Sequence, residues 1–382
     1  MQIIIVGGGP AAVAAAESIR VYDRHSRIII FSAEKILPYR RPLLISKLNN
    51  PVPDERFFIH DQHFYDRNNI EIKLNSRVIA IDWPENCIVL SDQTRCSYDS
   101  LLLAYGASAK KTAGQLPANV FTLHDSEDVP PVRAMLTKAR SATVIGGGIL
   151  GLETAGSCLQ LNKKTTLIER SSEIMHGILD CECGNFLHEQ LLARNPDLQI
   201  ITNCDLTALH ESAAGQINCI FASGTTDRMS VENVILALGF QTSPPGWQPP
   251  VKNCKLEVDR FMKLKGFENI FAAGDCAFYP QIPSGSYRNA VQMGRIAGAN
   301  IAGEQEFIRI PPREMRGSFM DFKLYCAGEI LSDDLEFAVH IKQGFLRKLY
   351  YRNQQLVGCV LLGDVSGSSE FYHAISANWR CI

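Results

Sequence analysis

Short apolar runs alternate along this chain with longer stretches in which apolar residues recur at helical spacing. One strand–helix–strand unit is predicted at residues 2–6, 10–21 and 27–31. A second unit of matched lengths is predicted at residues 142–145, 149–161 and 164–168. Repeated units of this kind are typical of folds in which helices cover parallel sheets. We therefore predict an α/β protein with two Rossmann-like domains.

Each predicted unit carries a glycine-rich loop between its first strand and its helix. The second copy fits the pattern G-x-G-x-x-G in full, and the first has alanine in the last place, which the pattern allows. Their residues are Gly7, Gly9 and Ala12 in the first copy and Gly146, Gly148 and Gly151 in the second. Such a loop needs glycine for a tight turn and glycine where the backbone meets a pyrophosphate. Two copies predict that one polypeptide binds two dinucleotides.

The rest of the chain is predicted as short strands separated by breaks. Further strands are expected at residues 78–82, 87–90, 101–104 and 231–238. A proline-rich stretch at residues 243–250 predicts a crossing between domains. Beyond it, residues 318–363 are predicted to be rich in strands and residues 368–378 to be helical.

Length and charge narrow the class of protein. The chain has 382 residues and a formal net charge of −2. Its length predicts two or three domains, and the balanced charge argues against nucleic acid or an anionic membrane surface as the main partner. No run approaches the roughly 18 apolar residues that span a bilayer, and the start lacks the basic leader of a secretion signal. We therefore expect a soluble, cytoplasmic protein.

Two glutamates stand where a dinucleotide fold places an acidic residue, about 20 positions beyond the glycines. Glu34 follows the first predicted unit and Glu169 the second. A carboxylate at Glu169 would accept from ribose hydroxyls and repel a 2′-phosphate, which favours NADH over NADPH. The neighbouring Arg170 weakens that inference because a guanidinium can pair with the extra phosphate. The alternative is that both glutamates are solvated residues at strand ends.

A third informative string is the apolar run at residues 270–273 followed by Gly274 and Asp275. A buried carboxylate there would be costly without a hydroxyl or backbone partner. We expect Asp275 to bond a ribityl hydroxyl of a flavin, although the string read alone would be a turn.

Together these features resemble the two-dinucleotide flavoprotein superfamily, in particular its NADH-dependent rubredoxin and ferredoxin reductase branch, which includes the flavoprotein portion of assimilatory nitrite reductases. The strings that carry the resemblance lie at residues 37–44, 98–107, 147–153 and 289–294. The first of them is similar to the branch's Pro-Tyr-x-Arg-Pro-x-Leu segment, and the second to its Tyr-Asp-x-Leu-Leu-Leu-Ala-Thr-Gly-Ala string. The domains that the resemblance implies are FAD-binding at 1–110 and 241–310, NAD(P)H-binding at 111–240, and C-terminal α+β at 313–382.

The resemblance also implies which residues contact each cofactor. The FAD site comprises Gly7, Gly9, Pro10, Ala11, Ala12, Glu34, Arg41, Lys47, Val78, Gly106, Gly274 and Asp275. The NAD site comprises Gly146, Gly148, Ile149, Leu150, Gly151, Glu153, Glu169 and Gly239. Lys47 near the flavin and Glu153 near the nicotinamide are the two candidates for a side-chain role in the chemistry. For Arg41, Lys47 and Glu153 the alternative is an ordinary solvated residue.

Two positions depart from the family pattern. The family's Ser-Lys pair follows one residue late, as Ser46 and Lys47. Tyr105 stands where the family has threonine, and its phenol could crowd the flavin, stack on it or point outward. The sequence leaves these three orientations open.

The placement of the twelve cysteines decides the subclass. Residues 35–60 contain none and no C-x2-C occurs, so the positions from which disulfide reductases of this superfamily attack lack a thiolate. This excludes glutathione, lipoamide or thioredoxin reductase chemistry. Cys276, predicted near FAD, and the pair Cys181 and Cys183 are interpreted as reduced structural residues.

No Ser/His/Asp triad or metal site stands out, and His124, His176 and His188 are expected to be surface or hydrogen-bonded residues.

Taken together, the motifs and the resemblance predict an FAD-dependent NAD(P)H oxidoreductase in which NADH passes hydride to the flavin and electrons leave for a rubredoxin, ferredoxin or flavodiiron partner. An acidic partner of this kind could meet Lys342, Arg347 and Lys348, unless these form a merely solvated face. The alternatives are a flavoprotein subunit of a larger dehydrogenase, and a flavin-stabilised binding or assembly subunit whose redox activity has lapsed. A monomer and a homodimer remain equally open.

Overall fold

The computed structural model of the chain describes residues 1–52, 55–112, 114–222, 227–242, 256–280 and 282–378. The chain divides into two compact units, each built from three segments. Unit 1 comprises Met1–Ser108, His124–Glu127 and Phe240–Ile310. Unit 2 comprises Ala109–Leu123, Asp128–Gly239 and Pro311–Ile382. The proline-rich stretch predicted to be a crossing, at residues 243–250, lies outside the described residues.

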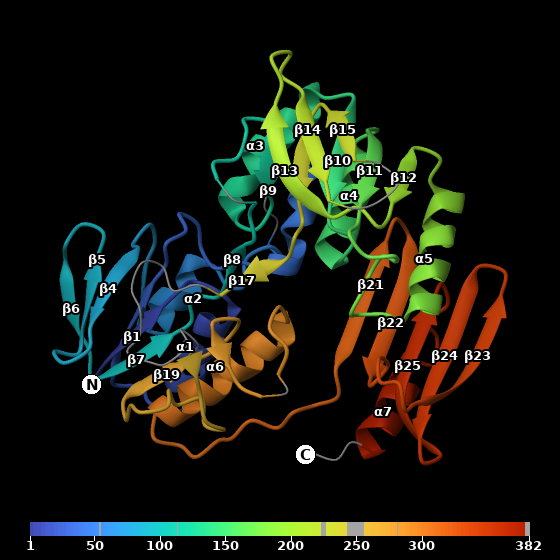
Figure 1. Ribbon diagram of the computed structural model, residues 1–382. Helices are drawn as coiled ribbons and strands as arrows, with labels where there is room; N and C mark the ends of the chain where they lie inside the picture. The colour runs from blue at the N-terminus through green and yellow to red at the C-terminus, as the bar shows by residue number, and fades with distance from the viewer. Residues whose placement is uncertain (53–54, 113, 223–226, 243–255, 281, 379–382) are drawn as a thin grey trace. The chain divides into compact units, whose positions relative to one another are not determined.

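A five-stranded parallel sheet forms the centre of unit 1 (Figure 1). In spatial order its strands are β19 (Ile270–Ala272), β7 (Ser100–Leu103), β1 (Gln2–Val6), β2 (Arg27–Phe31) and β3 (Ile70–Lys73). Ile3 of the middle strand pairs with Ile28 on one side and with Ser100 on the other. Residues 3–5 are completely buried, as expected for a parallel sheet that is covered on both faces.

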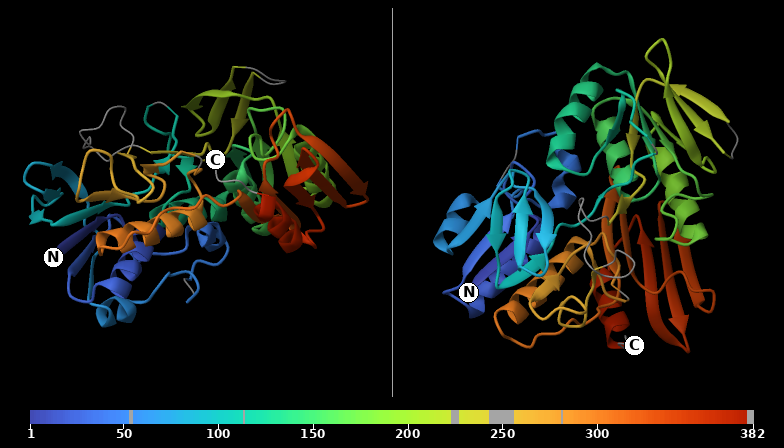
Figure 2. Two further views of the ribbon diagram at one scale, coloured as in Figure 1. Left: turned by 90° about the horizontal axis from the view of Figure 1, so that it is seen from below. Right: turned by 60° about the vertical axis from the view of Figure 1, so that its left-hand side comes forward.

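Helices α1 (Pro10–Tyr22) and α6 (Tyr287–Ile301) lie side by side in unit 1 (Figure 2). Small residues allow this contact: a Cβ atom at Gly294 would lie 2.2 Å from the carbonyl oxygen of Ala11. The other helical elements of the unit are η1 (Arg41–Leu43), η2 (Ile45–Leu48) and α2 (Gln62–Arg67). Its smaller strands are β4 (Val78–Asp82), β5 (Cys87–Leu90), β6 (Arg95–Ser97), β18 (Leu256–Glu257) and β20 (Ala277–Phe278).

Unit 2 contains a second five-stranded parallel sheet, which repeats the first strand–helix–strand unit. In spatial order its strands are β12 (Leu198–Ile201), β11 (Lys164–Ile168), β10 (Ser141–Ile145), β16 (Val234–Leu236) and β9 (Val120–Thr122). Its helices are α3 (Val129–Lys138), α4 (Ile149–Gln160) and α5 (Cys181–Arg194). An antiparallel meander follows, formed by β13 (Leu206–Glu211), β14 (Ile217–Phe221) and β15 (Arg228–Val231). Where the chain passes between units lie β8 (Ser108–Ala109), η3 (Ser126–Asp128) and β17 (Phe240–Gln241).

An antiparallel five-stranded sheet completes unit 2. In spatial order its strands are β21 (Glu314–Phe319), β22 (Phe322–Gly328), β25 (Gln355–Leu362), β24 (Phe345–Arg352) and β23 (Glu336–Lys342). Leu346 and Leu362 share a core with Leu187 of α5, whereas Leu361 packs with Ile375 of α7 (Ser368–Asn378). The two helices therefore cover opposite faces of this sheet, and β23 forms one of its edges (Figure 1).

The predicted α/β class with two Rossmann-like units is confirmed. The strands predicted at residues 27–31, 78–82 and 87–90 and the helix at residues 368–378 have the predicted bounds. Among the described residues, no helix combines the length and the apolar character that crossing a membrane requires.

Candidate functional site

The glycine-rich loop of unit 1 joins the end of β1 to the start of α1. Gly7 has a φ of +118°, and a Cβ atom there would lie 2.2 Å from the carbonyl oxygen of Ala104, so only glycine fits this turn. Gly9, the N-cap of α1, is extended, and a Cβ atom there would meet nothing within 4 Å. The loop therefore leaves open space beside the N–H groups that begin the helix, which is where these folds hold a phosphate group.

The loop of unit 2 repeats this geometry. Gly146 has a φ of +116°, and its Cβ position is 2.3 Å from the carbonyl oxygen of Ala237. A Cβ atom at Gly148, the N-cap of α4, would again meet nothing within 4 Å. At Gly151 a Cβ atom would lie 1.7 Å from the carbonyl oxygen of Gly146, so the third glycine is required for close packing of the helix against the loop. Both predicted cradles are therefore present as shapes that a pyrophosphate fits.

Glu169 lies directly beside the second loop. Its side chain is buried, and its two carboxylate oxygens accept hydrogen bonds from the backbone N–H of Gly147 at 2.5 Å and of Ser171 at 2.8 Å. The alternative that Glu169 is a solvated strand end is therefore wrong. Sequence reasoning missed that this carboxylate also braces the loop, because a side-chain bond to a backbone N–H leaves no local pattern.

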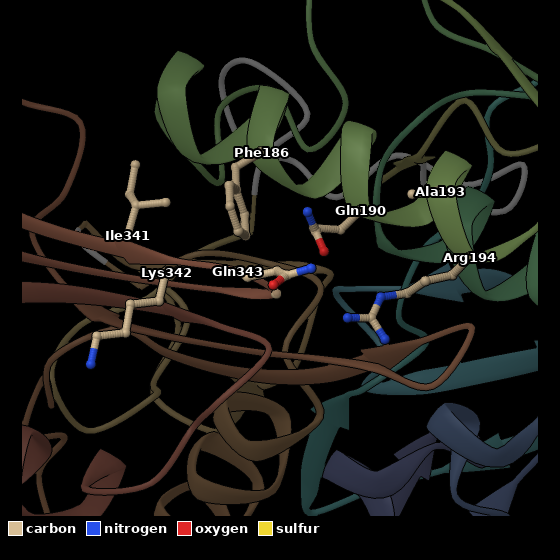
Figure 3. A pocket seen from close by; sticks show the side chains of 8 residues that line it. Phe186, Gln190, Ala193, Arg194, Ile341, Lys342 and Gln343 are labelled. Atoms are coloured by element: carbon tan, nitrogen blue, oxygen red, sulfur yellow. The ribbon is translucent and has the colours of Figure 1, made fainter.

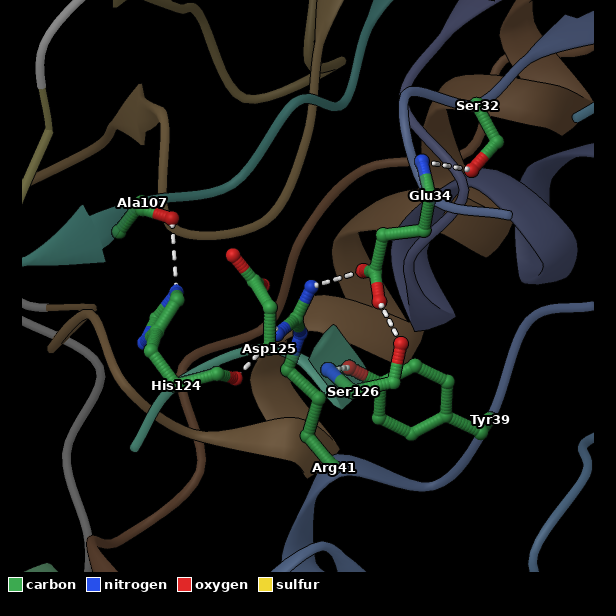
Figure 4. A network of polar contacts seen from close by, with 8 residues as sticks. All are labelled: Ser32, Glu34, Tyr39, Arg41, Ala107, His124, Asp125 and Ser126. Carbon is green, nitrogen blue, oxygen red and sulfur yellow. Dashed lines mark hydrogen bonds and ion pairs between the residues drawn. The ribbon is translucent and has the colours of Figure 1, made fainter. Parts of the chain in front are cut away.

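Glu34 and Arg41 meet in a polar network in unit 1 (Figure 4). One oxygen of Glu34 accepts from Arg41 Nη2 at 2.7 Å, and the other accepts from the Ser126 hydroxyl at 3.0 Å. Arg41 Nη1 also donates to Asp125 Oδ1 at 2.8 Å and to the carbonyl oxygen of His124 at 2.7 Å. Glu34 and Arg41 are therefore held in place by each other and by residues 124–127, and neither is a freely solvated charge.

The Gly274–Asp275 string returns to the start of α1. A Cβ atom at Gly274 would lie 3.2 Å from the Cβ of Ala11, which puts this turn beside the first helical residues of unit 1. Asp275 Oδ1 accepts from the backbone N–H of Gly285 at 2.7 Å, and burial raises the pKa of this carboxyl. Because this carboxyl is partly desolvated beside the loop, a hydrogen bond from the hydroxyl group of a bound polyol would stabilise it.

Cys276 is a buried residue whose thiol donates to the carbonyl oxygens of Leu103 and Ala273, at 3.3 and 3.4 Å. Burial raises the pKa of this thiol to about 12, which disfavours the thiolate that exchange chemistry needs. The geometry agrees with a packing role.

Lys47 and Tyr105 also lie inward in unit 1. Lys47 is buried, donates to the carbonyl oxygen of Val52 at 3.2 Å, and holds its Nζ 5.0 Å from the ring centre of Phe57. It is therefore not a solvated loop charge. Tyr105 packs against the apolar core of the unit, and burial raises the pKa of its phenol, so an outward orientation is wrong.

The remaining predicted residues fall around the two loops and at the ends of nearby strands. In unit 1 these are Pro10, Ala11 and Ala12 at the start of α1, Val78 at the start of β4, and Gly106 just beyond β7. In unit 2 they are Ile149, Leu150 and Glu153 in the first turns of α4 and Gly239 beyond β16. The residues predicted for FAD therefore all lie in unit 1, and the residues predicted for NAD all lie in unit 2.

Glu153 is a half-buried residue of α4, and burial raises the pKa of its carboxyl to about 7. Because the folded state holds this proton more tightly than the unfolded chain does, the free energy of unfolding falls as the pH rises from about 4.5 through 7. We expect Glu153→Gln to stabilise the protein at pH 8 by about 3 kcal/mol, and by far less at pH 4.5. Urea denaturation at both pH values measures this. The exposed Glu189→Gln serves as control, and an equal effect at both pH values would contradict the shift.

Two of the three histidines named from the sequence, His124 and His176, have ordinary partners. His124 Nε2 lies 2.8 Å from the carbonyl oxygen of Ala107, and His176 Nδ1 lies 2.5 Å from Glu173 Oε1. His188 is half-buried, and burial lowers its pKa. Within the described ranges of the chain, no three His, Cys, Asp or Glu side chains come together in a way that could hold a metal ion.

Lys348 is buried, so the prediction that Lys342, Arg347 and Lys348 form one accessible basic cluster is wrong for this residue. Its Nζ lies 2.7 Å from both Asp180 Oδ2 and Glu182 Oε2 at the start of α5. The reason is the period of a strand: Lys348 alternates with its neighbours and points to the same face as Leu346. Lys342, in the exposed strand β23, remains accessible.

Comparison with known proteins adds relatives to these observations. A family model described as pyridine nucleotide-disulphide oxidoreductase matches residues 1–299. The chain is 28% identical over 377 residues to the rubredoxin-NAD(+) reductase of Pseudomonas putida, covering 94% of each chain. It is 26% identical over 390 residues to the NAD(P)H nitrite reductase of Bacillus subtilis (strain 168), covering 98% of this chain and 47% of that protein. Its fold is similar to the solved structure of NADH:rubredoxin oxidoreductase from Clostridium acetobutylicum, with a TM-score of 0.80, 22% identity, and coverage of 98% of this chain and 95% of that one.

Proposed function

Because the chain belongs to the pyridine nucleotide-disulphide oxidoreductase family, as its motifs predicted, we propose that it is a flavoprotein that oxidises NADH and delivers the electrons to a small redox protein. The observation that carries this proposal is the pair of open loops at Gly9 and Gly148, each at the start of a helix. Two such loops accommodate two pyrophosphates on one chain.

We assign FAD to the loop of unit 1, in an FAD domain of residues 1–110 and 241–310. The backbone N–H groups at the start of α1 would bind the pyrophosphate, Glu34 would accept from the adenosine ribose, and Asp275 from a ribityl hydroxyl. Arg41 would act mainly on Glu34, since its ion pair at 2.7 Å fixes the orientation of that carboxylate. When bound, FAD supplies the redox chemistry, because it accepts a hydride and can release electrons singly.

We assign NADH to the loop of unit 2, in a domain of residues 111–240. A separate C-terminal domain is proposed at residues 313–382. The buried carboxylate of Glu169 supports NADH over NADPH, because the extra 2′-phosphate would meet a negative charge that is already fixed beside Gly147. The chain's role here is to bind and orient NADH.

The charge of Glu169 offers a direct test of this preference. We expect Glu169→Gln, which keeps an oxygen acceptor for the Gly147 N–H, to shift the ratio of kcat/KM values toward NADPH by about tenfold, since Arg170 then meets the phosphate unopposed. Steady-state rates with both nucleotides measure this, with Glu189→Gln as the control. An unchanged ratio would show that Glu169 does not discriminate between NADH and NADPH.

We propose that the electrons leave the flavin without passing through a protein disulfide. The absence of cysteine from residues 35–60 supports this, as does the buried Cys276 thiol with its raised pKa. The natural acceptor is then a one-electron carrier, and the relative that is a rubredoxin-NAD(+) reductase supports a rubredoxin-like protein.

Anaerobic stopped-flow spectroscopy tests the function. NADH should bleach the protein-bound flavin, and a panel of rubredoxins and ferredoxins should then reoxidise it. A protein that holds FAD but is bleached by neither NADH nor NADPH would overturn the proposal. The nitrite reductase relative, of which this chain matches 47%, supports a second candidate, a flavoprotein part of a larger enzyme. Co-purification of a second chain, with no reduction of free redox proteins, would favour it.

A further inference from the structure

Strand β23 is an exposed apolar edge of the C-terminal sheet. All seven of its residues are exposed. Three large apolar side chains, Phe337, Val339 and Ile341, are 57%, 43% and 49% exposed. They occupy alternate positions, so they lie on one face of the strand. Edges of this length and apolar character pair readily with another strand unless something blocks them.

The hairpin fixes which backbone groups of β23 point to the open side. Lys342 pairs with Phe345 across a two-residue loop, so these two residues form the hydrogen-bonded pair that closes the hairpin. Hydrogen-bonded and non-hydrogen-bonded pairs alternate from there along the ladder. The N–H and C=O groups of Ile341, Val339 and Phe337 therefore point away from β24, toward the open edge.

The sequence of β23 is complementary to itself when it is reversed about Val339. An antiparallel copy centred there sets Phe337 opposite Ile341, which are both apolar. It also sets Glu336 opposite Lys342, which are of opposite charge. Both pairings occur twice because of the two-fold symmetry. Opposite charges and apolar residues directly across an antiparallel pair stabilise it.

We propose that β23 is the interface with a second copy of this chain, paired antiparallel about Val339 so that two five-stranded sheets become one sheet of ten strands. The outward backbone groups of Phe337, Val339 and Ile341 then exchange hydrogen bonds with the same residues of the second copy. Glu336 and Lys342 fall at the closely spaced, non-hydrogen-bonded positions, where side chains across the pair are nearest.

The surface beside β23 suits this arrangement. Phe337 lies on the same face as Lys348, whose Nζ is 4.0 Å from its ring centre, and that face is the one covered by α5. A groove of about 610 Å³ runs between α5 and the end of the hairpin, lined by Phe186, Gln190, Arg194, Ile341 and Lys342 among others (Figure 3). Phe337 of the second copy, set opposite Ile341, would add an aromatic ring to the face that carries this groove.

Sedimentation equilibrium of the full-length flavoprotein tests the pairing. We expect the wild type to form a dimer, and Val339→Lys to be monomeric at the same concentrations, because it sets two like charges face to face at the symmetry axis. Val21→Lys, at a valine of α1 that is 69% exposed, is the matched control and should leave the dimer intact. Reduction of the flavin by NADH should be unchanged in both variants.

A charge exchange gives the sharper test. Glu336→Lys and Lys342→Glu should each raise the dissociation constant of the dimer by about tenfold or more, since each converts two attractive pairs into repulsive ones. The double variant restores opposite charges and should return the constant to within a few-fold of the wild type. Wild-type protein that is monomeric at every concentration would overturn the proposal, as would a double variant weaker than both single variants. A monomer in which Val339→Lys weakens only the binding of a redox protein would assign the strand to that partner instead.

Discussion

Gly9→Val is expected to leave unit 1 folded and to abolish binding of the flavin that we propose for its glycine-rich loop. The extended backbone of Gly9, with φ −89° and ψ −178°, accepts any side chain, and nothing lies within 4 Å of the new Cβ atom. The added isopropyl group would occupy the open space at the start of α1, where the pyrophosphate is proposed to bind. We expect the affinity for FAD to fall by at least about 100-fold, equivalent to about 2.7 kcal/mol, and the purified protein to be colourless.

Gly148→Val is the matched control for that experiment. Its backbone has φ −82° and ψ −170°, and its Cβ position is equally open. This variant should purify with its full flavin absorbance and fail to be bleached by NADH, although a chemical reductant still bleaches it. Circular dichroism should show both variants folded. Flavin lost from the Gly148 variant and retained by the Gly9 variant would reverse the assignment of the two loops.

Lys348→Met is expected to lower the free energy of unfolding of unit 2 by about 1–3 kcal/mol, because it removes a buried cation from two carboxylates, of which Asp180 is the less exposed. Lys348 is paired at 2.7 Å with Asp180 and Glu182, and the Asp180 carboxylate also accepts from the Tyr350 hydroxyl at 2.6 Å. Burial alone would raise the pKa of Asp180, but Lys348 and Tyr350 hold it below its ordinary value. The variant would leave that carboxylate without its cation.

Urea denaturation followed by circular dichroism measures the loss. Lys323→Met, at an exposed lysine of β22 in the same sheet, is the control and should change stability by less than about 0.5 kcal/mol. Adding Asp180→Asn to Lys348→Met should recover most of the loss, because the amide oxygen still caps α5 by accepting from the Cys183 N–H, while the amide NH2 group can donate to the Tyr350 hydroxyl oxygen. Equal losses in the single and double variants would contradict an electrostatic origin.

The glycine loops were predictable from the sequence because their three requirements fall within one short segment of the chain. A tight turn, an open approach and close helix packing each select glycine or alanine at a fixed spacing. The alternation of apolar runs likewise predicted most strands of both parallel sheets, although β3, β9 and β12 were not predicted. In these cases the local pattern and the tertiary environment demand the same residue types.

The network around Arg41 could not be predicted, because its partners are remote in the chain. Asp125 and Ser126 belong to a four-residue segment that lies 84 residues beyond Arg41 and 92 beyond Glu34, and nothing in its composition indicates that it joins unit 1. The burial of Lys348 did leave a signal. Leu346, Lys348 and Tyr350 alternate with less buried neighbours, so the period-two rule applied to β24 would have turned the lysine inward.

Because the chain path of unit 1 is interrupted, its parallel sheet cannot be completed until late in synthesis. Strand β7 ends at Leu103, and its neighbour β19 begins only at Ile270, after every strand of the parallel sheet in unit 2. At about 5–20 residues per second, a ribosome needs roughly 10–30 s to reach the missing strand. During that interval one edge of a hydrophobic sheet stays unpaired while the strands of the second parallel sheet are synthesised. Binding of the flavin that we propose for unit 1 is therefore expected late in biosynthesis, and a chain that stops before residue 270 would expose an apolar sheet edge to chaperones and proteases.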